Sequence, residues 1–347
     1  MAKKLRMGVI GLGMGRGHVK GYQDDPRAEV VALCDINEKR LEAAAAEFKV
    51  PQTYRDAGEM FDKADLDAVS VATPNILHAP LTVEAFKRGL HVLCEKPMAM
   101  TVKESERMLA ASKRARRNLM INFSFRFSEM SFALKRQVEA GAVGDIYFGR
   151  TVWHRRRGIP IGSGWFGNKK LAGGGPLIDL GVHRLDLALW LMDYPAPVSV
   201  SGATYDPIAR RTVPKTQVYT VEDLACGLIR FANGATLILE ASWAANLPER
   251  EMMMTTLCGT KGGLTQKNIE GGYKFQAEIY TDEGGHLFTK KLDWSMVRVP
   301  SAYSEFVSSI LEKRPPLATG EQGLKVMKIL EGIYRSAETG REVRYRA

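Results

Sequence analysis

The sequence predicts two domains of different class: an α/β domain built on a parallel sheet, then a domain built on a mostly antiparallel sheet. The chain has 347 residues, too many for one ordinary core. Its first part alternates short β-branched runs with amphipathic stretches, the pattern of parallel βαβ units. Its second part holds longer alternating runs typical of antiparallel strands. The predicted domains are residues 1–125 and 126–347.

The first domain contains five runs that predict strands, at residues 5–11, 29–35, 66–73, 91–96 and 119–125. Helix-forming stretches such as 37–48 and 76–89 lie between most of them. The runs are apolar on both faces, as strands of a sheet covered on both sides must be. Thr101 and Glu104 have the spacing of a capping box, which predicts a helix start.

The second domain begins with a predicted helix near 128–140, followed by strand-like runs at 145–155, 223–245 and 251–264. Asn233-Gly234 lies between two alternating runs and predicts a tight hairpin. A helical stretch follows at 323–340, and this C-terminal helix could pack back on the first domain.

The composition is that of a soluble globular protein, with 45% hydrophobic and 25% charged residues. No run of 18 apolar residues suggests a membrane span, and the N-terminus passes into a strand without a cleavage site for a signal peptide. The cysteines form no CxxC pair, which favours reduced thiols in a cytoplasmic protein. They are Cys34, Cys94, Cys226 and Cys258.

The net charge of +10 raises the question of a nucleic-acid partner. The basic clusters at 113–117 and 154–157 lie in no recognisable nucleic-acid motif and are not interleaved with aromatic residues. We therefore expect no nucleic acid. The first cluster is best interpreted as a solvated helix end, while an anionic cofactor or substrate could use some of the remaining charge.

A glycine-rich loop, "GVIGLGMGRGH", ends the first predicted strand. The dinucleotide-binding fingerprint is GxGxxG between a strand and a helix. Gly11 would make the tight turn and Gly13 would let the backbone approach a pyrophosphate at the helix start. Arg16 stands where the third glycine belongs, and Gly15 comes one residue early, after Met14, so the loop departs from the pattern.

An acid ends the second predicted strand, because Asp35 lies 35 − 13 = 22 residues after Gly13. There it can accept hydrogen bonds from the ribose hydroxyls of a dinucleotide. Strand, loop and acid together predict a Rossmann domain that binds NAD, since the carboxylate would repel a 2′-phosphate. Arg16 and Arg40 could accommodate that phosphate, so NADP stays possible. The alternative is a flexible glycine turn in an unliganded α/β protein.

The next two strand ends carry polar residues that should face the same ligand, because ligands bind at the carboxyl ends of parallel strands. Thr73 and Asn75 form a turn after the third strand, and His78 follows on the next helix, where it could also be a core or capping histidine. Glu95 and Lys96 end the following strand, and the next residue is a proline that restricts Lys96 to an extended backbone.

A polar stripe marks an otherwise apolar stretch, "GGGPLIDLGVHRLDLALWLMD", which predicts a buried helix from Pro176 on. Asp179, His183 and Asp186 stand at i, i+4 and i+7, on one predicted face. Burying such groups is costly unless they are partnered, and Asp179 can fix the tautomer of His183 and raise its basicity. The alternative is an Asp–His pair that serves packing alone.

Together, "GVIGLGMGRGH", "CEKP" and "GGGPLIDLGVHRLD" resemble the glucose-fructose oxidoreductase / inositol dehydrogenase / MocA family, and the resemblance covers nearly the whole chain. It implies a Rossmann domain followed by an open-faced antiparallel sheet domain. It also implies an NAD(P) cofactor, a sugar, inositol or related polyol as substrate, and homodimers or homotetramers built through the sheet.

The resemblance also implies roles for individual residues. Lys96 matches the lysine that reaches nicotinamide and substrate, and Asp179 and His183 match the catalytic acid–histidine pair. Glu95 matches a residue near the nicotinamide ribose. Arg126 and Trp165 fall where pocket residues often lie. The residues expected at the cofactor are Gly11, Gly13, Met14, Gly15, Asp35, Arg40, Thr73, Asn75, His78, Glu95 and Lys96. A cis bond before Pro97 is also suggested.

The expected reaction is reversible hydride transfer between nicotinamide C4 and a carbinol carbon, with His183 as general base and Lys96 hydrogen-bonded to the reacting oxygen. No metal is expected, because the six histidines form no HExxH or similar ligand set. Two alternatives remain: an NAD-assisted glycosidase that acts by transient oxidation at C3, and a non-catalytic NAD-binding protein.

Overall fold

The computed structural model describes residues 4–162 and 164–345. The chain forms two compact units. The first consists of Met1–Asn122 and Pro300–Met327, and the second of Phe123–Val299 and Lys328–Ala347. A late segment of the chain therefore belongs to the first unit, which a single boundary at residue 125 does not describe.

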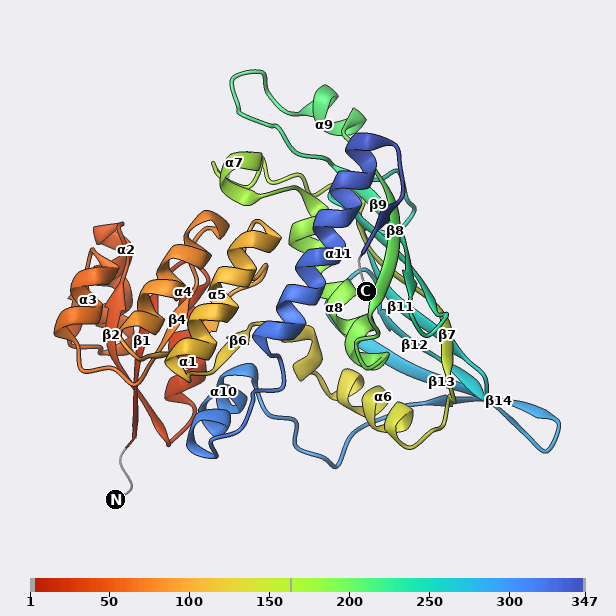
Figure 1. Cartoon of the computed structure of the whole chain (residues 1–347), viewed down its shortest axis with the longest axis horizontal. Helices are drawn as coiled ribbons and strands as arrows, with labels where there is room; N and C mark the ends of the chain where they lie inside the picture. The colour runs from red at the N-terminus through yellow and green to blue at the C-terminus, as the bar shows by residue number, and fades with distance from the viewer. Residues whose placement is uncertain (1–3, 163, 346–347) are drawn as a thin grey trace. The chain divides into compact units, whose positions relative to one another are not determined.

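Six parallel strands form the sheet of the first unit, in the spatial order β3-β2-β1-β4-β5-β6 (Figure 1). They are β1 (Leu5–Ile10), β2 (Ala28–Cys34), β3 (Gln52–Tyr54), β4 (Ala68–Val71), β5 (His91–Cys94) and β6 (Leu119–Ile121). Strand β1 pairs with both β2 and β4, so the strand order reverses there, and ligands of such sheets bind outside the carboxyl ends at this switch point. The predicted parallel α/β domain is confirmed.

The helices of the first unit follow its strands along the chain, except α10, which belongs to the segment Pro300–Met327. They are α1 (Gly15–Gln23), α2 (Glu38–Phe48), α3 (Ala57–Lys63), the 3₁₀ turn η1 (Asn75–Leu77), α4 (His78–Lys87), α5 (Val102–Ala115) and α10 (Ala302–Leu311). The Thr101 side chain accepts from the Glu104 N–H at 3.2 Å, and the Glu104 carboxylate accepts from the Met100 N–H at 3.1 Å. The predicted helix start and the Thr101 cap are therefore confirmed, while Glu104 reaches the main chain one residue before the cap instead of at Thr101 itself.

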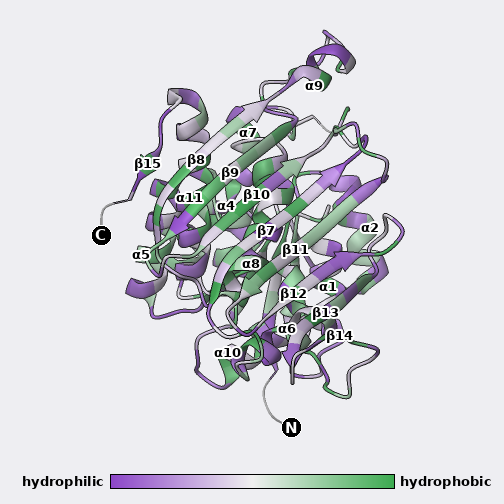
Figure 2. Cartoon of the chain, turned by 90° about the vertical axis from the view of Figure 1, so that its right-hand side faces the viewer, coloured by the Kyte–Doolittle hydropathy of each residue, from purple (hydrophilic) through white to green (hydrophobic). Residues whose placement is uncertain are grey.

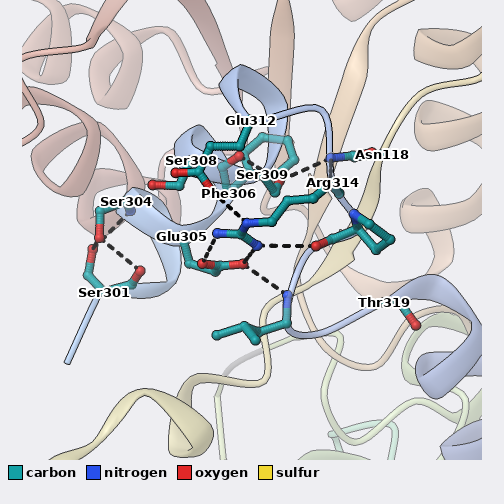
Figure 3. Close-up of polar contacts among 12 residues, drawn as sticks. Asn118, Ser301, Ser304, Glu305, Phe306, Ser308, Ser309, Glu312, Arg314 and Thr319 are labelled. Carbon is teal, nitrogen blue, oxygen red and sulfur yellow. Dashed lines mark hydrogen bonds and ion pairs between the residues drawn. The ribbon is translucent and has the colours of Figure 1, made fainter.

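The segment Pro300–Met327, called here the returning segment, is held by polar contacts within itself and by contacts with Asn118 of the first unit (Figure 3). Glu305 on α10 is 3% exposed and accepts two hydrogen bonds from the Arg314 guanidinium, at 2.6 and 2.8 Å. The Leu317 N–H donates to the same carboxylate at 3.0 Å. Asn118, which precedes β6, donates at 3.0 Å to both the Ser309 hydroxyl and the Arg314 carbonyl.

The ring of Tyr303, at the start of α10, packs directly on helix α1. A Cβ added to Gly21 would lie 2.0 Å from this ring, so only glycine lets the two elements approach so closely. The ring also meets His18 edge-on, with the two centroids 4.9 Å apart. The returning segment thus covers the helix that follows the glycine loop.

Nine strands form the sheet of the second unit, in the order β14-β13-β12-β11-β7-β10-β9-β8-β15. They are β7 (Ile146–Arg155), β8 (Pro197–Tyr205), β9 (Leu224–Phe231), β10 (Thr236–Ser242), β11 (Glu251–Gly259), β12 (Gly262–Asn268), β13 (Phe275–Glu283), β14 (His286–Lys291) and β15 (Val343–Arg344). All neighbours are antiparallel except β7 and β10. The mostly antiparallel sheet and the hairpin at Asn233-Gly234, where Gly234 has φ +86°, are confirmed.

One face of this sheet is buried and the other is open. Along β9 and β10, buried residues alternate with half-exposed ones. Figure 2 views the open face, over which no helix of the described residues lies, and its strands carry a mixture of hydrophobic and hydrophilic residues. The open-faced sheet that the family resemblance implied is therefore present.

The remaining helices belong to the second unit, except that α11 (Gly320–Thr339) is shared between both units. They are η2 (Ser124–Phe127), α6 (Glu129–Glu139), α7 (Lys169–Ala172), the π-helical turn η3 (Leu177–Gly181), α8 (Val182–Leu191) and α9 (Pro207–Thr212). Turn η3 packs against β10, and α8 packs against β7 and β11. None of the helices in the described parts of the chain is both long and apolar enough to cross a membrane.

Candidate functional site

The glycine loop connects β1 to α1, and each glycine has a different steric environment. Gly11 has φ +85°, and a Cβ there would lie 2.5 Å from the Ala72 carbonyl oxygen, so only glycine fits. A Cβ on Gly13 would meet only the Arg40 guanidinium, at 4.0 Å. The protein itself leaves the main chain open at Gly13, as the approach of a pyrophosphate requires.

Gly15 performs the packing role of the third glycine of the fingerprint, whose position is occupied by Arg16. A Cβ on Gly15 would lie 2.9 Å from Val9 Cγ1, so its absence lets α1 pack closely on β1. Close packing of helix on strand is the role that the fingerprint gives to its third glycine. The Arg16 guanidinium pairs with Glu47 at the end of α2, and Met14 in the loop is 71% exposed.

Asp35 is fixed beside this loop at the end of β2. It is buried, and its two carboxylate oxygens accept the Leu12 and Asn37 N–H groups, both at 2.8 Å. Arg40 on α2 lies 3.3 Å from the same carboxylate. Asn37 also caps α2, with its side chain accepting from the Arg40 N–H at 3.0 Å. Loop and acid are thus brought together, as the 22-residue spacing predicts.

The end of β4 carries Thr73 and Asn75, and its turn is held by His78. The His78 ring is fully buried, with Nδ1 at 2.7 Å from the Pro97 carbonyl and Nε2 at 2.9 Å from the Thr73 carbonyl. Burial lowers the pKa of His78, although both carbonyl groups oppose this effect. This position does not support the expected contact of His78 with a cofactor, because both ring nitrogens already face the main chain. Thr73 Oγ1 is buried and has no hydrogen-bond partner among the described residues, so it could serve a ligand.

Glu95 and Lys96 follow β5, and the Lys96–Pro97 peptide bond is cis. Glu95 is buried and faces the interior of the first unit. Its Oε1 lies 2.8 Å from His18 Nε2 and accepts from Asn122 Nδ2 at 2.6 Å. Burial alone would raise the pKa of Glu95, but the contact with His18, together with Asn122 and Lys96, lowers it to about 2. Sequence reasoning missed His18 and Asn122, although Asn122 stands at a strand end beside Glu95.

Asp179 and His183 lie in the second unit, on η3 and α8. The indole N–H of Trp243 donates to Asp179 Oδ2 at 3.0 Å. The His183 ring packs against Phe125 and Trp153, with centroid distances of 5.0 and 5.7 Å. Both residues are half-buried, so an acid and a histidine lie four residues apart at the edge of an aromatic cluster.

Glu222 determines where the η3 turn begins. Its carboxylate accepts the Gly175 and Leu177 N–H groups at 3.0 and 3.1 Å and the Tyr334 hydroxyl at 2.8 Å. Burial raises the pKa of Glu222, and these donors oppose the shift. A Cβ on Gly175 would lie 2.3 Å from the Glu222 carbonyl oxygen, so the glycine-rich stretch lets the two segments approach. The start of the η3 turn, which carries Asp179, is thus held by an acid from a distant part of the chain.

Two of the residues expected at the site, Asp186 on the polar stripe and Arg126, bind each other. Asp186 accepts two hydrogen bonds from Arg126, at 2.8 and 2.6 Å, and both residues are buried. Arg126 therefore has a buried counter-ion within its own unit, which does not support the expected contact with substrate. Asp179 lies on the π-helical turn η3, while His183 and Asp186 lie on α8, so a face common to all three stays a prediction.

Trp165, also expected at the pocket, stacks on Phe166 with centroids 4.0 Å apart. Phe166 in turn meets the ring of Trp243 at 6.4 Å. Trp165 is thereby connected, through the ring of Phe166, to Trp243, the residue that binds Asp179. The second unit brings Trp165, Asp179 and His183 into one neighbourhood, while Lys96 belongs to the first unit, and its approach to them stays a prediction.

No cluster of three or more His, Cys, Asp or Glu side chains in the described residues could hold a metal ion. What the site offers is a glycine cradle with an acid beside it, and a separate acid–histidine pair. The first arrangement fits a dinucleotide, and the second fits proton transfer.

Comparison with known proteins agrees with this geometry. Residues 5–123 match the family described as "Oxidoreductase family, NAD-binding Rossmann fold", and residues 132–265 match the "GFO/IDH/MocA C-terminal domain". The chain is 34% identical to the D-glucoside 3-dehydrogenase of Escherichia coli (strain K12) over 98% of its own length and 97% of that protein.

Two solved structures share the whole fold. One is an aldose-aldose oxidoreductase from Caulobacter crescentus complexed with glycerol, with TM-score 0.84 and 29% identity over 99% of this chain and 100% of that one. The other is a levoglucosan dehydrogenase in complex with NADH and levoglucosan, with TM-score 0.87 and 25% identity over the same shares of the two chains. The chain belongs to the glucose-fructose oxidoreductase / inositol dehydrogenase / MocA family of NAD-binding oxidoreductases.

Proposed function

We propose that this protein is an NAD-dependent dehydrogenase that transfers a hydride between nicotinamide C4 and a hydroxyl-bearing carbon of a sugar, inositol or related polyol. The observation that carries the proposal is the pair of Asp179 and His183, four residues apart, in a chain whose other unit holds a dinucleotide cradle. The names of the relatives support a sugar-like substrate, since they act on glucosides, aldoses and levoglucosan.

The nucleotide would be held by Gly11, Gly13 and Asp35, with the Thr73 hydroxyl as a further donor. The open main chain at Gly13 and the orphaned Thr73 hydroxyl support this assignment. The buried Asp35 carboxylate favours NAD over NADP, because a 2′-phosphate would meet a like charge. Arg40 is already paired with Asp35, which weakens its use as a phosphate ligand.

The proton would be handled by the second unit. His183 takes the proton of the substrate hydroxyl as general base, while Asp179 stabilises the imidazolium that forms. Trp243 donates to Asp179, and an indole can only donate, so Asp179 is the acceptor in this contact. Lys96 hydrogen-bonds the reacting oxygen and stabilises the charge that develops there. The bound nicotinamide supplies the acceptor for the hydride that leaves the same carbon.

The test is a screen for reduction of NAD, followed by absorbance, with D-glucosides, levoglucosan, free aldoses, inositols and sugar acids. We expect at least one of these polyols to reduce NAD. With that substrate, Lys96→Ala and His183→Ala should each lower kcat by roughly 10²–10⁴, because each removes one acid–base or electrostatic contribution. NAD binding, measured by calorimetry, should persist in both variants. Wild-type kcat in both variants would falsify the assignment.

The two alternatives give different outcomes in the same screen. An NAD-assisted glycosidase releases an aglycone from a glycoside without net NADH. A non-catalytic protein binds NAD in the calorimeter and consumes no polyol.

The proposal includes a homodimer or homotetramer formed through the open face of the nine-stranded sheet. Support comes from Leu228, Ile238 and Met254, apolar side chains that lie half-exposed on that face. Ile238→Glu should yield monomers by light scattering, whereas Leu311→Glu on α10 should not.

A cytoplasmic, reducing setting is also proposed, since all four cysteines are free thiols.

A further inference from the structure

A buried polar cluster lies directly beneath Lys96 in the first unit. It consists of His18 on α1, Glu95 after β5 and Asn122 after β6. All three are buried, with at most 9% of any residue exposed. A charged cluster in a parallel-sheet domain is costly, and apolar side chains of similar volume would stabilise such a site at least as well. The cluster therefore calls for an explanation other than stability.

The Glu95 carboxylate connects three separate elements. Its Oε1 contacts His18 Nε2 at 2.8 Å and Asn122 Nδ2 at 2.6 Å. Its Oε2 accepts the main-chain N–H of Lys96 at 3.2 Å. A carboxylate held by two donors on one oxygen has a fixed orientation, so its other oxygen fixes the peptide that precedes the Lys96 side chain.

His18 adds a connection to the nucleotide loop. It lies one turn after Gly15, on the same helix that the glycine loop opens. The helix α1 is thus joined to the main chain of Lys96 by two successive hydrogen bonds through the Glu95 carboxylate. The ring edge of Tyr303 covers His18 from the other side, at a centroid distance of 4.9 Å.

We propose that His18 and Asn122 are positioning residues that act through the Glu95 carboxylate to hold Lys96 for reaction. The inference rests on the proposed function, because it gives Lys96 its task at the reacting oxygen. The expected signature is a loss in kcat with little change in the binding of NAD or substrate, since Lys96 acts on charge that develops in the transition state.

The decisive variant is His18→Phe, measured with the polyol identified in the screen. Phenylalanine keeps the ring contact with Tyr303 and removes the donor to Glu95. We expect kcat to fall about tenfold or more, the loss of one hydrogen bond to a charged group. The dissociation constant for NAD, measured by calorimetry, and the KM for the polyol should stay near the wild-type values. His18→Gln keeps an N–H donor in similar reach and should recover most of kcat.

The matched control is His91→Phe. His91 lies at the opposite end of β5, where its Nδ1 accepts the Asn118 N–H at 3.0 Å, far from the lysine end of the strand. This variant should keep wild-type kcat. If His18→Phe also keeps wild-type kcat, or if His18→Gln is as slow as His18→Phe, the positioning role is wrong.

Asn122→Leu provides a second route should His18→Phe fail to fold. It removes the other donor to Glu95 Oε1 and should show the same fall in kcat without a change in KM. Wild-type kcat in a folded Asn122→Leu protein overturns the inference. The proposed function fails separately, and the inference with it, if the wild-type protein reduces NAD with none of the polyols. An active wild type, inactive Lys96→Ala and unaffected His18 and Asn122 variants reject the positioning role alone.

Discussion

The Trp243 indole N–H donates a hydrogen bond to Asp179 Oδ2 at 3.0 Å. Trp243 is 1% exposed and belongs to the apolar cluster formed by Trp153, Leu180 and Met253. The Asp179 carboxylate is thus bound by a side chain that is itself buried in the core. The orientation of Asp179 therefore depends on the packing of the second unit.

If Asp179 serves His183 as proposed, Trp243→Phe should lower kcat about tenfold, because it removes a hydrogen bond to a charged group, which contributes about 1.5–3 kcal/mol. Phenylalanine retains part of the buried ring, and the fold can be verified by circular dichroism. Trp294→Phe is the matched control, since Trp294 is 68% exposed. Equal kcat values for the two variants would show that Trp243 only fills space.

Asp35 offers a test of the choice between cofactors. The variant Asp35→Ser removes the carboxylate that would repel the 2′-phosphate of NADP, and it leaves Arg40 without its partner. NADP should therefore become acceptable as a cofactor. We expect the ratio of kcat/KM for NADP to that for NAD to rise at least about tenfold, mainly through weaker NAD binding. Asp24→Ser, which breaks only an exposed pair with Lys20, should leave the ratio unchanged. A ratio that does not move would argue against a ribose contact at Asp35.

The ion pair of Arg126 and Asp186 predicts a large effect on stability. Arg126→Met leaves a buried carboxylate without its counter-charge and should lower the free energy of unfolding by about 3–5 kcal/mol. Combining it with Asp186→Asn should recover much of this loss, because the remaining amide can still bind the Tyr194 hydroxyl. Urea denaturation measures both. If Arg126→Met were as stable as the wild type, Arg126 would not be needed to balance the charge of the buried Asp186 carboxylate.

The pH dependence of stability should report the ionisation of Glu95. Its folded-state pKa of about 2 lies below the ordinary value of 4.5, so its contribution is present above pH 4.5 and is lost as the pH falls towards 2. The difference in unfolding free energy between the wild type and Glu95→Gln should therefore shrink between about pH 4.5 and pH 2. A difference that is constant over this range would show that Glu95 does not titrate with a lowered pKa.

The sequence predicted those features that depend on local order along the chain. The strand ends that carry Gly11, Asp35, Thr73 and Lys96 could be found because parallel strands leave their carboxyl ends at one edge of a sheet. The capping box of α5 and the hairpin at Asn233-Gly234 were equally local.

The features that sequence reasoning missed or misplaced are set by partners far away in the chain. Glu95 contacts His18, which lies 77 residues before it, and Asp186 pairs with Arg126, which lies 60 residues before it. The η3 turn is held by Glu222, 45 residues after Leu177. Periodicity in one helix contains no information about such partners, so the pattern at 179, 183 and 186 looked uniform.

The contact of Tyr303 with Gly21 and His18 has a consequence for biosynthesis. As the chain emerges from the ribosome, residues 4–122 can form their strands early, but the Tyr303 ring that packs on helix α1 is translated about 180 residues later. Until then α1 lacks the ring that covers Gly21 and His18, and surface exposed in incomplete folds favours aggregation. The first unit is thus completed only near the end of synthesis, and a fragment that stops at residue 125 should be prone to aggregation.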